Sequence, residues 1–375
     1  MRILHAVTLF SPDGAYGGPV RVALNQASAL RDSGHEVTIA AGVRGYDPIP
    51  TEQEGVPLAL NAARNLVPGV GFAGLAAPAM LTWLRKHRSE FDVVHVHLAR
   101  DLVMLPFATA VHTMGIPFVV QSHGMLAPKS NPLAPALDAL FVRRLLRQAH
   151  TVFCLTEQER QGISSVARGG ARIEMLNNGV PEYEAAEPPA SPPEILYLAR
   201  LHARKRPLDF VEAAKMVLEE GLTAKFALVG PDEGEAGEVL ESTAGRHEIA
   251  WEGPLPGGKG PERMRRASMY VLPSVNEPYP MSVLEAMAVG IPVVITNECG
   301  LADLVSRTGS GLVTVPGPGP IAEAMKTLLT DPTLAQSMGE RGRAAAGNQL
   351  SMQSVATRLT DTYVAATADR VRHGS

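Results

Sequence analysis

The stretch MYVLPSVNEPYPMSVLEAMAVGIPVVIT, Met269–Thr296, decides the fold. An apolar run at 269–274 has the composition of a strand, and so does a second run at 291–296. Between them, Pro280 suits the first position of a helix, and the apolar helical segment ends at Gly290, a residue typical of helix C-termini. Strand, helix and strand in this order predict parallel strands joined by a helix.

The same alternation continues along most of the chain. Strand-like apolar runs stand at 2–10, 36–42, 91–98, 116–124, 150–156, 195–200, 224–230, 248–253 and 311–315. Segments with helical periodicity separate several of them, at 20–34, 102–114, 137–148 and 208–220. Such alternation is typical of parallel sheets with helices on both faces. The sequence therefore predicts an α/β protein made of doubly wound, Rossmann-like lobes.

One segment breaks this pattern. Residues 181–194 read PEYEAAEPPASPPE, with five prolines and four glutamates, which favours a linker over a packed element. We expect an N-terminal lobe over residues 1–185 and a C-terminal lobe over 186–350. The helical segment at 351–372 follows the last strand-like run by a long way, and we expect it to return to the first lobe. Two such lobes would face a central cleft at the carboxyl ends of their strands.

Composition narrows the class of protein. The chain has 375 residues, enough for two domains, and 45% of them are hydrophobic while 19% are charged, as in soluble globular proteins. A net charge of −4 gives no reason to expect nucleic acid as a partner. Two cysteines cannot form a disulfide framework and favour a reducing compartment, so we expect a cytoplasmic protein. The apolar runs are too short to cross a membrane.

Glycines and cations follow the first strand of each lobe. Gly14, Gly17 and Gly18 precede a helix, where glycine lets an anion approach backbone N–H groups. An ordinary strand-to-helix turn explains these glycines equally well. In the segment ARLHARKRP, Arg200, Lys205 and their basic neighbours come directly after a strand. They could bind phosphate at the edge of the sheet, or form a solvated basic loop.

Histidines also stand at strand ends. His97 follows one strand-like run and His123 follows the next, and a neutral imidazole can donate to a sugar hydroxyl or a phosphate oxygen. A lone histidine is usually structural, but two at equivalent places on neighbouring strands favour a site. His95 lies inside its strand, and we expect it to be buried and hydrogen-bonded.

Two acids flank the start of the helix in the opening stretch. Glu277 falls in the loop after the strand, and Glu285 lies a turn inside the helix. Ser282 and Glu285 also fit a capping box, in which the glutamate would satisfy a backbone donor, but that interpretation leaves Glu277 unexplained. Near a helix N-terminus both carboxylates favour ionisation, and ionised carboxylates accept hydrogen bonds from the paired hydroxyls of a ribose or a pyranose.

The spacing of Glu277 and Glu285 within LPSVNEPYPMSVLEAMAVGIPVV resembles the signature of retaining family-four glycosyltransferases of the two-lobed B-type fold. The glycine loop, HVHLARD, QSHG, NNGV and the Arg200–Lys205 pair stand in a similar order, so the resemblance covers nearly the whole chain. This sequence has EPYP where the family usually has Glu-Gly-Phe-Gly, and Ala199 where it usually has glycine. These departures bear on the sugar contacts more than on the fold.

The resemblance implies the catalytic groups. Glu277 would face the transferred sugar and His123 would contact it. Arg200 and Lys205 would neutralise the diphosphate. The sugar would leave through an oxocarbenium-like state, and cations placed beforehand would stabilise the charge that grows on the leaving group.

The resemblance also implies a set of donor-binding positions. Glu285 would accept from the ribose, the two glycines would offer N–H groups to the diphosphate, the start of the helix would close around sugar and phosphate, and a second histidine would lie near the donor. In this sequence these positions are Gly17, Gly18, His97, Met281, Ser282 and Glu285. The donor would be a nucleotide-diphosphate sugar carrying a hexose, and the acceptor a hydroxyl of a sugar or polyol, in a glycan, a glycolipid or a small molecule.

We expect no metal and no cofactor, because the sequence has no Asp-x-Asp pair and no His/Cys group with ligand spacing. For the acceptor we expect contact from the long proline-rich stretch 123–137, which carries Lys129. Basic residues at 83–88 and 141–148 could attract anionic lipid if the acceptor were a lipid-linked sugar, but solvated helix faces are the better explanation. A sugar phosphorylase, a nucleotide-sugar epimerase and an inactive nucleotide-sugar-binding relative are the alternatives. The sequence does not define the oligomeric state.

Overall fold

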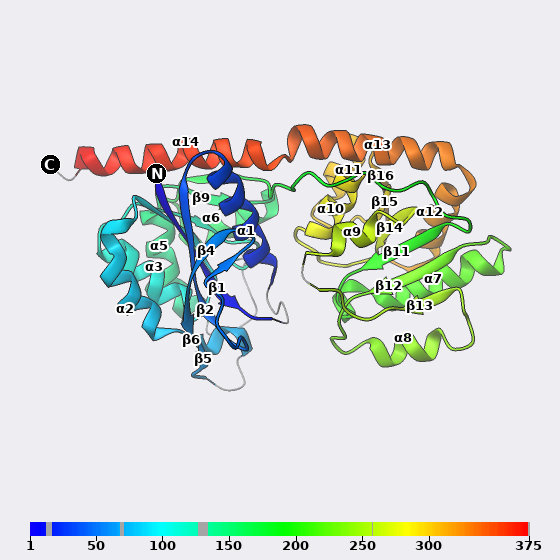
Figure 1. Cartoon of the computed structure of the whole chain (residues 1–375), viewed down its shortest axis with the longest axis horizontal. Helices are drawn as coiled ribbons and strands as arrows, with labels where there is room; N and C mark the ends of the chain where they lie inside the picture. Colours follow the sequence, from blue (N-terminus) through cyan, green and yellow to red (C-terminus); the bar gives the residue numbers. More distant parts are fainter. Residues whose placement is uncertain (13–16, 68–70, 127–133, 257, 374–375) are drawn as a thin grey trace. The chain divides into compact units, whose positions relative to one another are not determined.

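The computed structural model describes residues 1–12, 17–67, 71–126, 134–256 and 258–373. The chain divides into two compact units, one of Met1–Gly179 with Met352–Ser375 and one of Val180–Ser351 (Figure 1). The boundaries expected from the sequence differ from these by a few residues. The predicted linker has no helix or strand before Glu194, in keeping with its prolines, which cannot donate backbone hydrogen bonds.

The first unit is built on an eight-stranded sheet with the order β10-β9-β8-β7-β1-β2-β4-β3. The strands are β1 (Arg2–Phe10), β2 (Glu36–Val43), β3 (Glu52–Gln53), β4 (Val56–Ala62), β7 (Val93–His97), β8 (Phe118–Gln121), β9 (Val152–Cys154) and β10 (Ile173–Met175). All pairs are parallel except β3 with β4. The chain winds outward in both directions from β1 and β7, so these two strands form the topological switch point, where ligands bind in such sheets.

The second unit has a six-stranded parallel sheet with the order β13-β12-β11-β14-β15-β16. Its strands are β11 (Glu194–Leu198), β12 (Lys225–Val229), β13 (Ile249–Trp251), β14 (Met269–Leu272), β15 (Val293–Thr296) and β16 (Gly311–Thr314). Here the switch point lies between β11 and β14. These bounds confirm the predicted α/β class and all six strands that the sequence indicates for this half.

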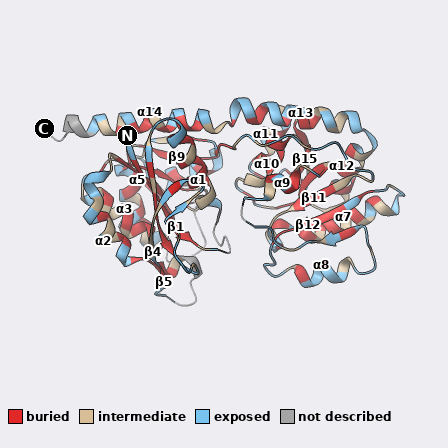
Figure 2. Cartoon of the chain, viewed as in Figure 1, coloured by how far each residue is buried: buried red, intermediate tan, exposed pale blue. Residues whose placement is uncertain are grey.

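Helices cover both sheets, and the buried strands lie between them (Figure 2). The helices of the first unit are α1 (Gly17–Asp32), α2 (Pro78–His87), α3 (Met104–Thr113), α4 (Ala134–Leu137), α5 (Arg143–Gln148), α6 (Glu157–Ala167) and α14 (Met352–His373). As expected, α14 belongs to the first unit: it runs along α1 and buries Val355, Leu359 and Tyr363 in the core beneath it (Figure 1).

The second unit carries α7 (Pro207–Glu219), α8 (Ala236–Ser242), α9 (Gly260–Met264), α10 (Met281–Val289), α11 (Ala302–Thr308), α12 (Pro318–Thr330) and α13 (Pro332–Gln349). Helix α10 ends at Gly290, whose φ of +94° is the left-handed conformation that glycine favours at a helix C-terminus. Its apolar residues complete the core between α10 and the sheet.

Several elements do not follow the expected pattern. Residues 137–148, expected to form one helix, contain a π-helical turn at Asp138–Val142 between α4 and α5. A short hairpin joins β5 (Arg64–Asn65) and β6 (Leu75–Ala76). Among the described residues, no helix has the combined length and apolar character that a bilayer span requires.

Candidate functional site

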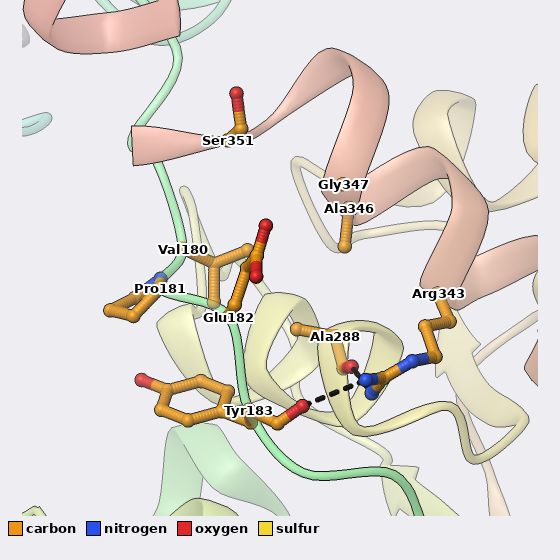
Figure 3. Close-up of a pocket in the computed structure, with 9 residues that line it drawn as sticks. All are labelled: Val180, Pro181, Glu182, Tyr183, Ala288, Arg343, Ala346, Gly347 and Ser351. Atoms are coloured by element: carbon orange, nitrogen blue, oxygen red, sulfur yellow. Dashed lines mark hydrogen bonds between the residues drawn. The ribbon is translucent and has the colours of Figure 1, made fainter. Parts of the chain in front are cut away.

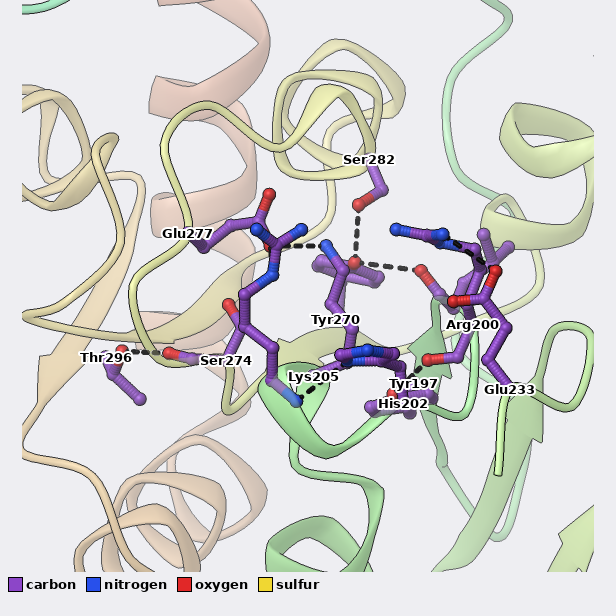
Figure 4. Close-up of polar contacts among 12 residues, drawn as sticks. Tyr197, Arg200, His202, Lys205, Glu233, Tyr270, Ser274, Glu277, Ser282 and Thr296 are labelled. Carbon is purple, nitrogen blue, oxygen red and sulfur yellow. Dashed lines mark hydrogen bonds and ion pairs between the residues drawn. The ribbon is translucent and has the colours of Figure 1, made fainter. Parts of the chain in front are cut away.

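The switch point of the second unit gathers the cations and one acid that the sequence singles out. Arg200 and Lys205 lie in the segment after β11, and Glu277 lies in the loop after β14, the strand beside it (Figure 4). The carboxyl ends of neighbouring parallel strands share one edge of the sheet, so residues far apart in sequence meet there.

Lys205 and Glu277 form a buried ion pair. Lys205 Nζ donates to Glu277 Oε2 at 2.6 Å, and the two side chains are only 11% and 8% exposed. Burial lowers the pKa of the Lys205 ammonium, and the facing carboxylate of Glu277 opposes that shift. The predicted diphosphate cation and the predicted sugar-facing acid are therefore in direct contact.

Arg200 has a different partner, which the sequence interpretation missed. Its guanidinium donates to Glu233 Oε1 at 2.7 Å, and its side chain is about half exposed. Glu233 follows β12, the other neighbour of β11, and its backbone N–H donates to Leu201 O. Arg204 adds a third cation, with its Nε 3.8 Å from Glu277 Oε2. The sequence gives one indication that Glu233 belongs to this site, namely that the residue follows the strand β12.

The first turn of α10 contains Met281 and Ser282, and Glu285 follows one turn later. The capping-box interpretation is wrong, because Pro280 is the N-cap and no side chain caps the helix. The Ser282 hydroxyl instead lies 2.7 Å from the Tyr270 hydroxyl, which lies 3.1 Å from Leu198 O. Burial raises the pKa of the Tyr270 phenol, and the nearby charges of Glu285 and Glu277 raise it further. Both acids are thus near this phenol.

A neighbouring segment holds the loop that carries Glu277. The Glu277 N–H donates to Glu298 O, and the Gly300 N–H donates to Glu277 O at 2.7 Å. A Cβ at Gly300 would lie 1.8 Å from Pro278 O, so only glycine fits there. The sequence gives Glu277 its place after a strand, but not this support from the residues that follow β15.

Left-handed backbone conformations occur at one candidate residue, His123, and at the direct neighbours of two others, Lys205 and Glu277. Arg206, which follows Lys205, has φ of 55°, and Asn276, which precedes Glu277, has φ of 49°. His123 itself has φ of 51°. For residues with a Cβ this left-handed region costs roughly 1–2 kcal/mol. Such conformations are concentrated at functional sites, where the surrounding contacts enforce them.

In the first unit, Glu159 enforces the turn that presents His123. Its buried carboxylate accepts from the Ser122 hydroxyl, from Gly124 N at 2.6 Å and from Leu155 N at 2.7 Å. Thr156 caps α6 by accepting from Glu159 N, so the pattern is that of a capping box whose glutamate serves a tertiary contact. Sequence reasoning missed Glu159.

The expectation of no histidine group with metal-ligand spacing needs correction. His5 on β1 and His95 and His97 on β7 bring one ring nitrogen each to within 4.8 Å of one another. The sequence hides this group because His5 comes from a distant strand. All three are buried, which lowers their pKa values, that of His5 to about 3. They are therefore neutral at physiological pH.

His97 and His123 occupy different environments. His97 is 1% exposed, and its two ring nitrogens already contact His5 and His123 among the described residues. His123 is half-buried, with a pKa that burial lowers to about 3. As expected, His95 is fully buried and hydrogen-bonded, with its partner on Tyr363.

The glycine loop is described only in part. Helix α1 begins at Gly17, and a Cβ at Gly18 would meet nothing within 4 Å among the described residues. Gly14 and Lys129, to which we assigned anion and acceptor contacts, lie outside the described residues.

A pocket of about 240 Å³ lies elsewhere in the second unit (Figure 3). Its walls are Val180, Pro181, Glu182, Tyr183, Ala288, Arg343, Ala346, Gly347 and Ser351. The Arg343 guanidinium there donates to Ala288 O at 2.7 Å and Tyr183 O at 2.9 Å, so it braces the backbone. None of the predicted site residues lines this pocket.

Two family models match the chain. One, described as glycosyl transferases group 1, matches residues 182–345, and the other, a glycosyl transferase 4-like domain, matches residues 17–179. The fold and these matches define a glycosyltransferase with the B-type fold. Within that class, the chain belongs to family four.

Relatives and solved structures agree with this assignment. Glycogen synthase of Mycobacterium tuberculosis is 26% identical over 398 residues, covering 98% of this chain and 95% of the relative. D-inositol 3-phosphate glycosyltransferase of Kribbella flavida is 27% identical, covering 75% and 78%. The crystal structure of Anabaena Alr3699/HepE in complex with UDP superposes with a TM-score of 0.78 and 17% identity, over 97% of this chain and 100% of that one.

Proposed function

We propose that this glycosyltransferase moves a hexose-type sugar from a nucleotide-diphosphate sugar to an acceptor hydroxyl, with retention at the anomeric carbon and without a divalent metal. The observation that carries the proposal is the meeting of Arg200, Lys205 and Glu277 at the switch point of the second unit. Anionic ligands bind at such points, and preorganised cations favour a diphosphate leaving group.

The roles proposed for the acids follow from their surroundings. Glu277 is buried beside the Lys205 ammonium, and its carboxylate oxygens can accept hydrogen bonds from sugar hydroxyls. Glu285 lies on α10, whose first turn offers backbone N–H groups to a phosphate. We assign Glu285 to the ribose, and Met281 and Ser282 to the sugar and phosphate. In the first unit we assign His123 to the sugar, and Gly17 and Gly18 to the diphosphate.

The metal-independent part of the proposal has a direct test. Arg200, Lys205 and Arg204 supply the positive charge that other enzymes take from a bound ion. Transfer activity should therefore persist in excess chelator. Complete loss of turnover with chelator, restored by magnesium or manganese, would contradict this part.

The donor can be identified by ligand binding. Uridine, guanosine and adenosine diphosphates and their sugar conjugates would be compared by thermal shift, with UDP first because the Anabaena protein was crystallised with UDP. We expect one base to raise the melting temperature, since a ligand that binds the folded state stabilises it. No shift with any nucleotide, at concentrations up to the millimolar range, would contradict the nucleotide-sugar assignment.

A product assay separates transfer from phosphorolysis and epimerisation. A transferase releases free nucleoside diphosphate in proportion to acceptor, whereas a phosphorylase needs inorganic phosphate and no nucleotide. Anomeric configuration of the product, read by proton NMR before mutarotation, tests retention. The two cysteines, Cys154 and Cys299, are free and buried, which supports the cytoplasmic location that we propose for this activity.

A further inference from the structure

Four imidazoles and one phenol form a continuous hydrogen-bonded chain inside the first unit. His123 Nε2 lies 2.7 Å from His97 Nδ1, and His97 Nε2 lies 3.1 Å from His5 Nδ1. His5 Nε2 then lies 3.4 Å from the Tyr363 hydroxyl, which lies 2.6 Å from His95 Nδ1. The chain joins β1, β7 and α14 to the half-buried His123 at the end of β8.

Burial favours the neutral form of every member of this chain. His5, His95, His97 and Tyr363 are at most 1% exposed. Burial lowers the pKa of each histidine and raises that of the phenol. A neutral imidazole has one N–H donor and one bare acceptor nitrogen.

Neutrality makes the tautomers depend on one another. If His97 donates from Nδ1 to His123, its Nε2 must accept from His5, and His5 Nε2 must accept from Tyr363. If His123 donates, each of these bonds reverses. A histidine in the other tautomer would place two N–H groups, or two lone pairs, against each other. The chain therefore has two concerted arrangements, and each fixes which nitrogen of His123 carries the proton. They differ at the far end, where the buried His95 Nε2 has no hydrogen-bond partner among the described residues. A buried N–H without a partner is less tolerated than a bare acceptor nitrogen, which favours the arrangement in which His95 Nδ1 donates to Tyr363 and His123 carries its proton on Nδ1.

Metal binding explains the cluster less well. The rings of His95 and His97 are stacked, with centroids 4.6 Å apart and planes 5° apart, and lone pairs lie in the ring planes. Their nitrogens therefore cannot converge on one ion without rotation. His5 Nδ1 and His97 Nε2 already contact each other at 3.1 Å. In addition, the group consists of three histidines, so none of its members brings a negative charge to offset the cost of burying a dication.

We propose that Tyr363, His5 and His97 are positioning residues that hold His123 in a single neutral tautomer, so that it presents one defined hydrogen-bonding nitrogen to its ligand. The Glu159 carboxylate, bound to Ser122 and Gly124, fixes the backbone on both sides of His123. The hydrogen-bonded chain of side chains fixes the His123 ring. The identity of that ligand as the donor sugar rests on the proposed function. The tautomer itself does not, and can be measured on the protein alone.

The test is the Tyr363→Phe variant, which removes the hydroxyl and little volume. Nitrogen-15 NMR of the imidazoles, with the His123 signals assigned through His123→Gln, reports the tautomer. We expect one tautomer in the parent protein and a mixture of both in Tyr363→Phe. The matched control is Thr360→Val on the same helix, which removes a hydroxyl bound to His35 outside the chain, and it should leave His123 unchanged.

Replacement of His5 provides a second comparison. His5→Asn keeps a polar group that can face His97, whereas His5→Leu does not, so the asparagine variant should preserve the tautomer better. Once a donor is known, Tyr363→Phe should lower kcat roughly fivefold, the worth of about one hydrogen bond, with little change in donor KM. A mixture of tautomers in the parent protein, or one unaltered tautomer in both Tyr363→Phe and His5→Leu, would overturn the proposal. Failure of every sugar donor would overturn the proposed function and leave the NMR result intact.

Discussion

Lys205 and Glu277 each have two roles: they neutralise each other in the folded protein, and they bind the substrate in the proposed reaction. In the described structure each neutralises the other, at 2.6 Å and away from water. In the proposed reaction Lys205 also meets a diphosphate, and the carboxylate must then remain satisfied by the lysine or by sugar hydroxyls. Removing one partner of a buried pair leaves an uncompensated charge, which is costly. Stability and catalysis are therefore coupled at this position.

Arg200→Ala and Lys205→Ala should each lower kcat/KM. We expect each variant to lose about 2–4 kcal/mol of transition-state stabilisation, as when one oxyanion donor is removed. They should differ in stability. Lys205→Ala removes the 2.6 Å partner of the buried Glu277 carboxylate and leaves it the longer, 3.8 Å contact with Arg204, so the melting temperature should fall. The half-exposed Arg200 can be removed with little effect. Steady-state kinetics and calorimetry would check both. Lys259→Ala, from an exposed surface pair, is the control. Near-parental turnover in both variants would remove the diphosphate assignment.

Glu285→Ala should weaken nucleotide affinity more than it slows saturated turnover, because the ribose is bound equally in the ground and transition states. Titration calorimetry with the nucleotide found by thermal shift gives the affinity, and kinetics at saturating donor gives the turnover. Glu241→Ala, on the exposed part of α8, is the matched control. If nucleotide affinity is unchanged in Glu285→Ala, Glu285 has a structural role in α10 and does not bind the ribose.

At the scale of elements, buried strands were the most predictable part. The runs that became β11, β14 and β15 are apolar apart from Glu194 and Thr296 at their ends, because both faces of a parallel sheet are covered. By contrast, β4 contains a proline and is largely half-exposed, and β10 has only three residues, one of them Glu174. Neither produces a continuous apolar run. The π-helical turn leaves no periodicity signal of its own.

The sequence predicted which residues stand at the candidate site, but it did not predict which other residues they contact. Strand ends and a helix start identified Arg200, Glu277 and His123, because ligands bind at the carboxyl ends of parallel strands. The partners came from other strands and helices: Glu233, Glu159 and the chain that runs back to Tyr363. Tyr363 stands 358 residues from His5, and no local pattern connects them.

The loop that carries Glu277 depends on the loop after β15, which leads to a prediction for Gly300→Ala. The added Cβ would lie 1.8 Å from Pro278 O, so one of the two loops must move. We expect kcat to fall at least tenfold, since small displacements of catalytic groups are costly. Gly319→Ala, where nothing lies within 4 Å, is the control and should keep full activity. Parental kinetics in Gly300→Ala would show that the loops adapt.

At the scale of the whole molecule, the buried histidines should make the stability of the two units depend differently on pH. His5, His95, His97 and His123 all belong to the first unit, and burial lowers all four pKa values from 6.5, to about 3 for His5 and His123. A lowered histidine pKa contributes stability that is fully present above pH 6.5. That stability is lost as pH falls toward 3, because the unfolded state takes up protons first.

The first unit should therefore lose stability faster than the second between pH 7.5 and 5.5. Each neutral buried histidine contributes at most about 1.4 kcal/mol per pH unit. The two tryptophans, Trp83 and Trp251, report on separate units, so urea unfolding of Trp251→Phe follows the first and that of Trp83→Phe the second. Equal loss in both units, or a larger loss in the second, would contradict the prediction.

The return of α14 to the first unit also constrains how the polypeptide matures on the ribosome. Val180–Ser351 can be complete before residues 352–373 leave the exit tunnel. The N-terminal sheet, although translated first, must wait for the helix that supplies Val355, Leu359 and Tyr363. The order of synthesis and the order of maturation are therefore opposed. Until residues 352–373 emerge, the apolar surface that awaits this helix is open to chaperones.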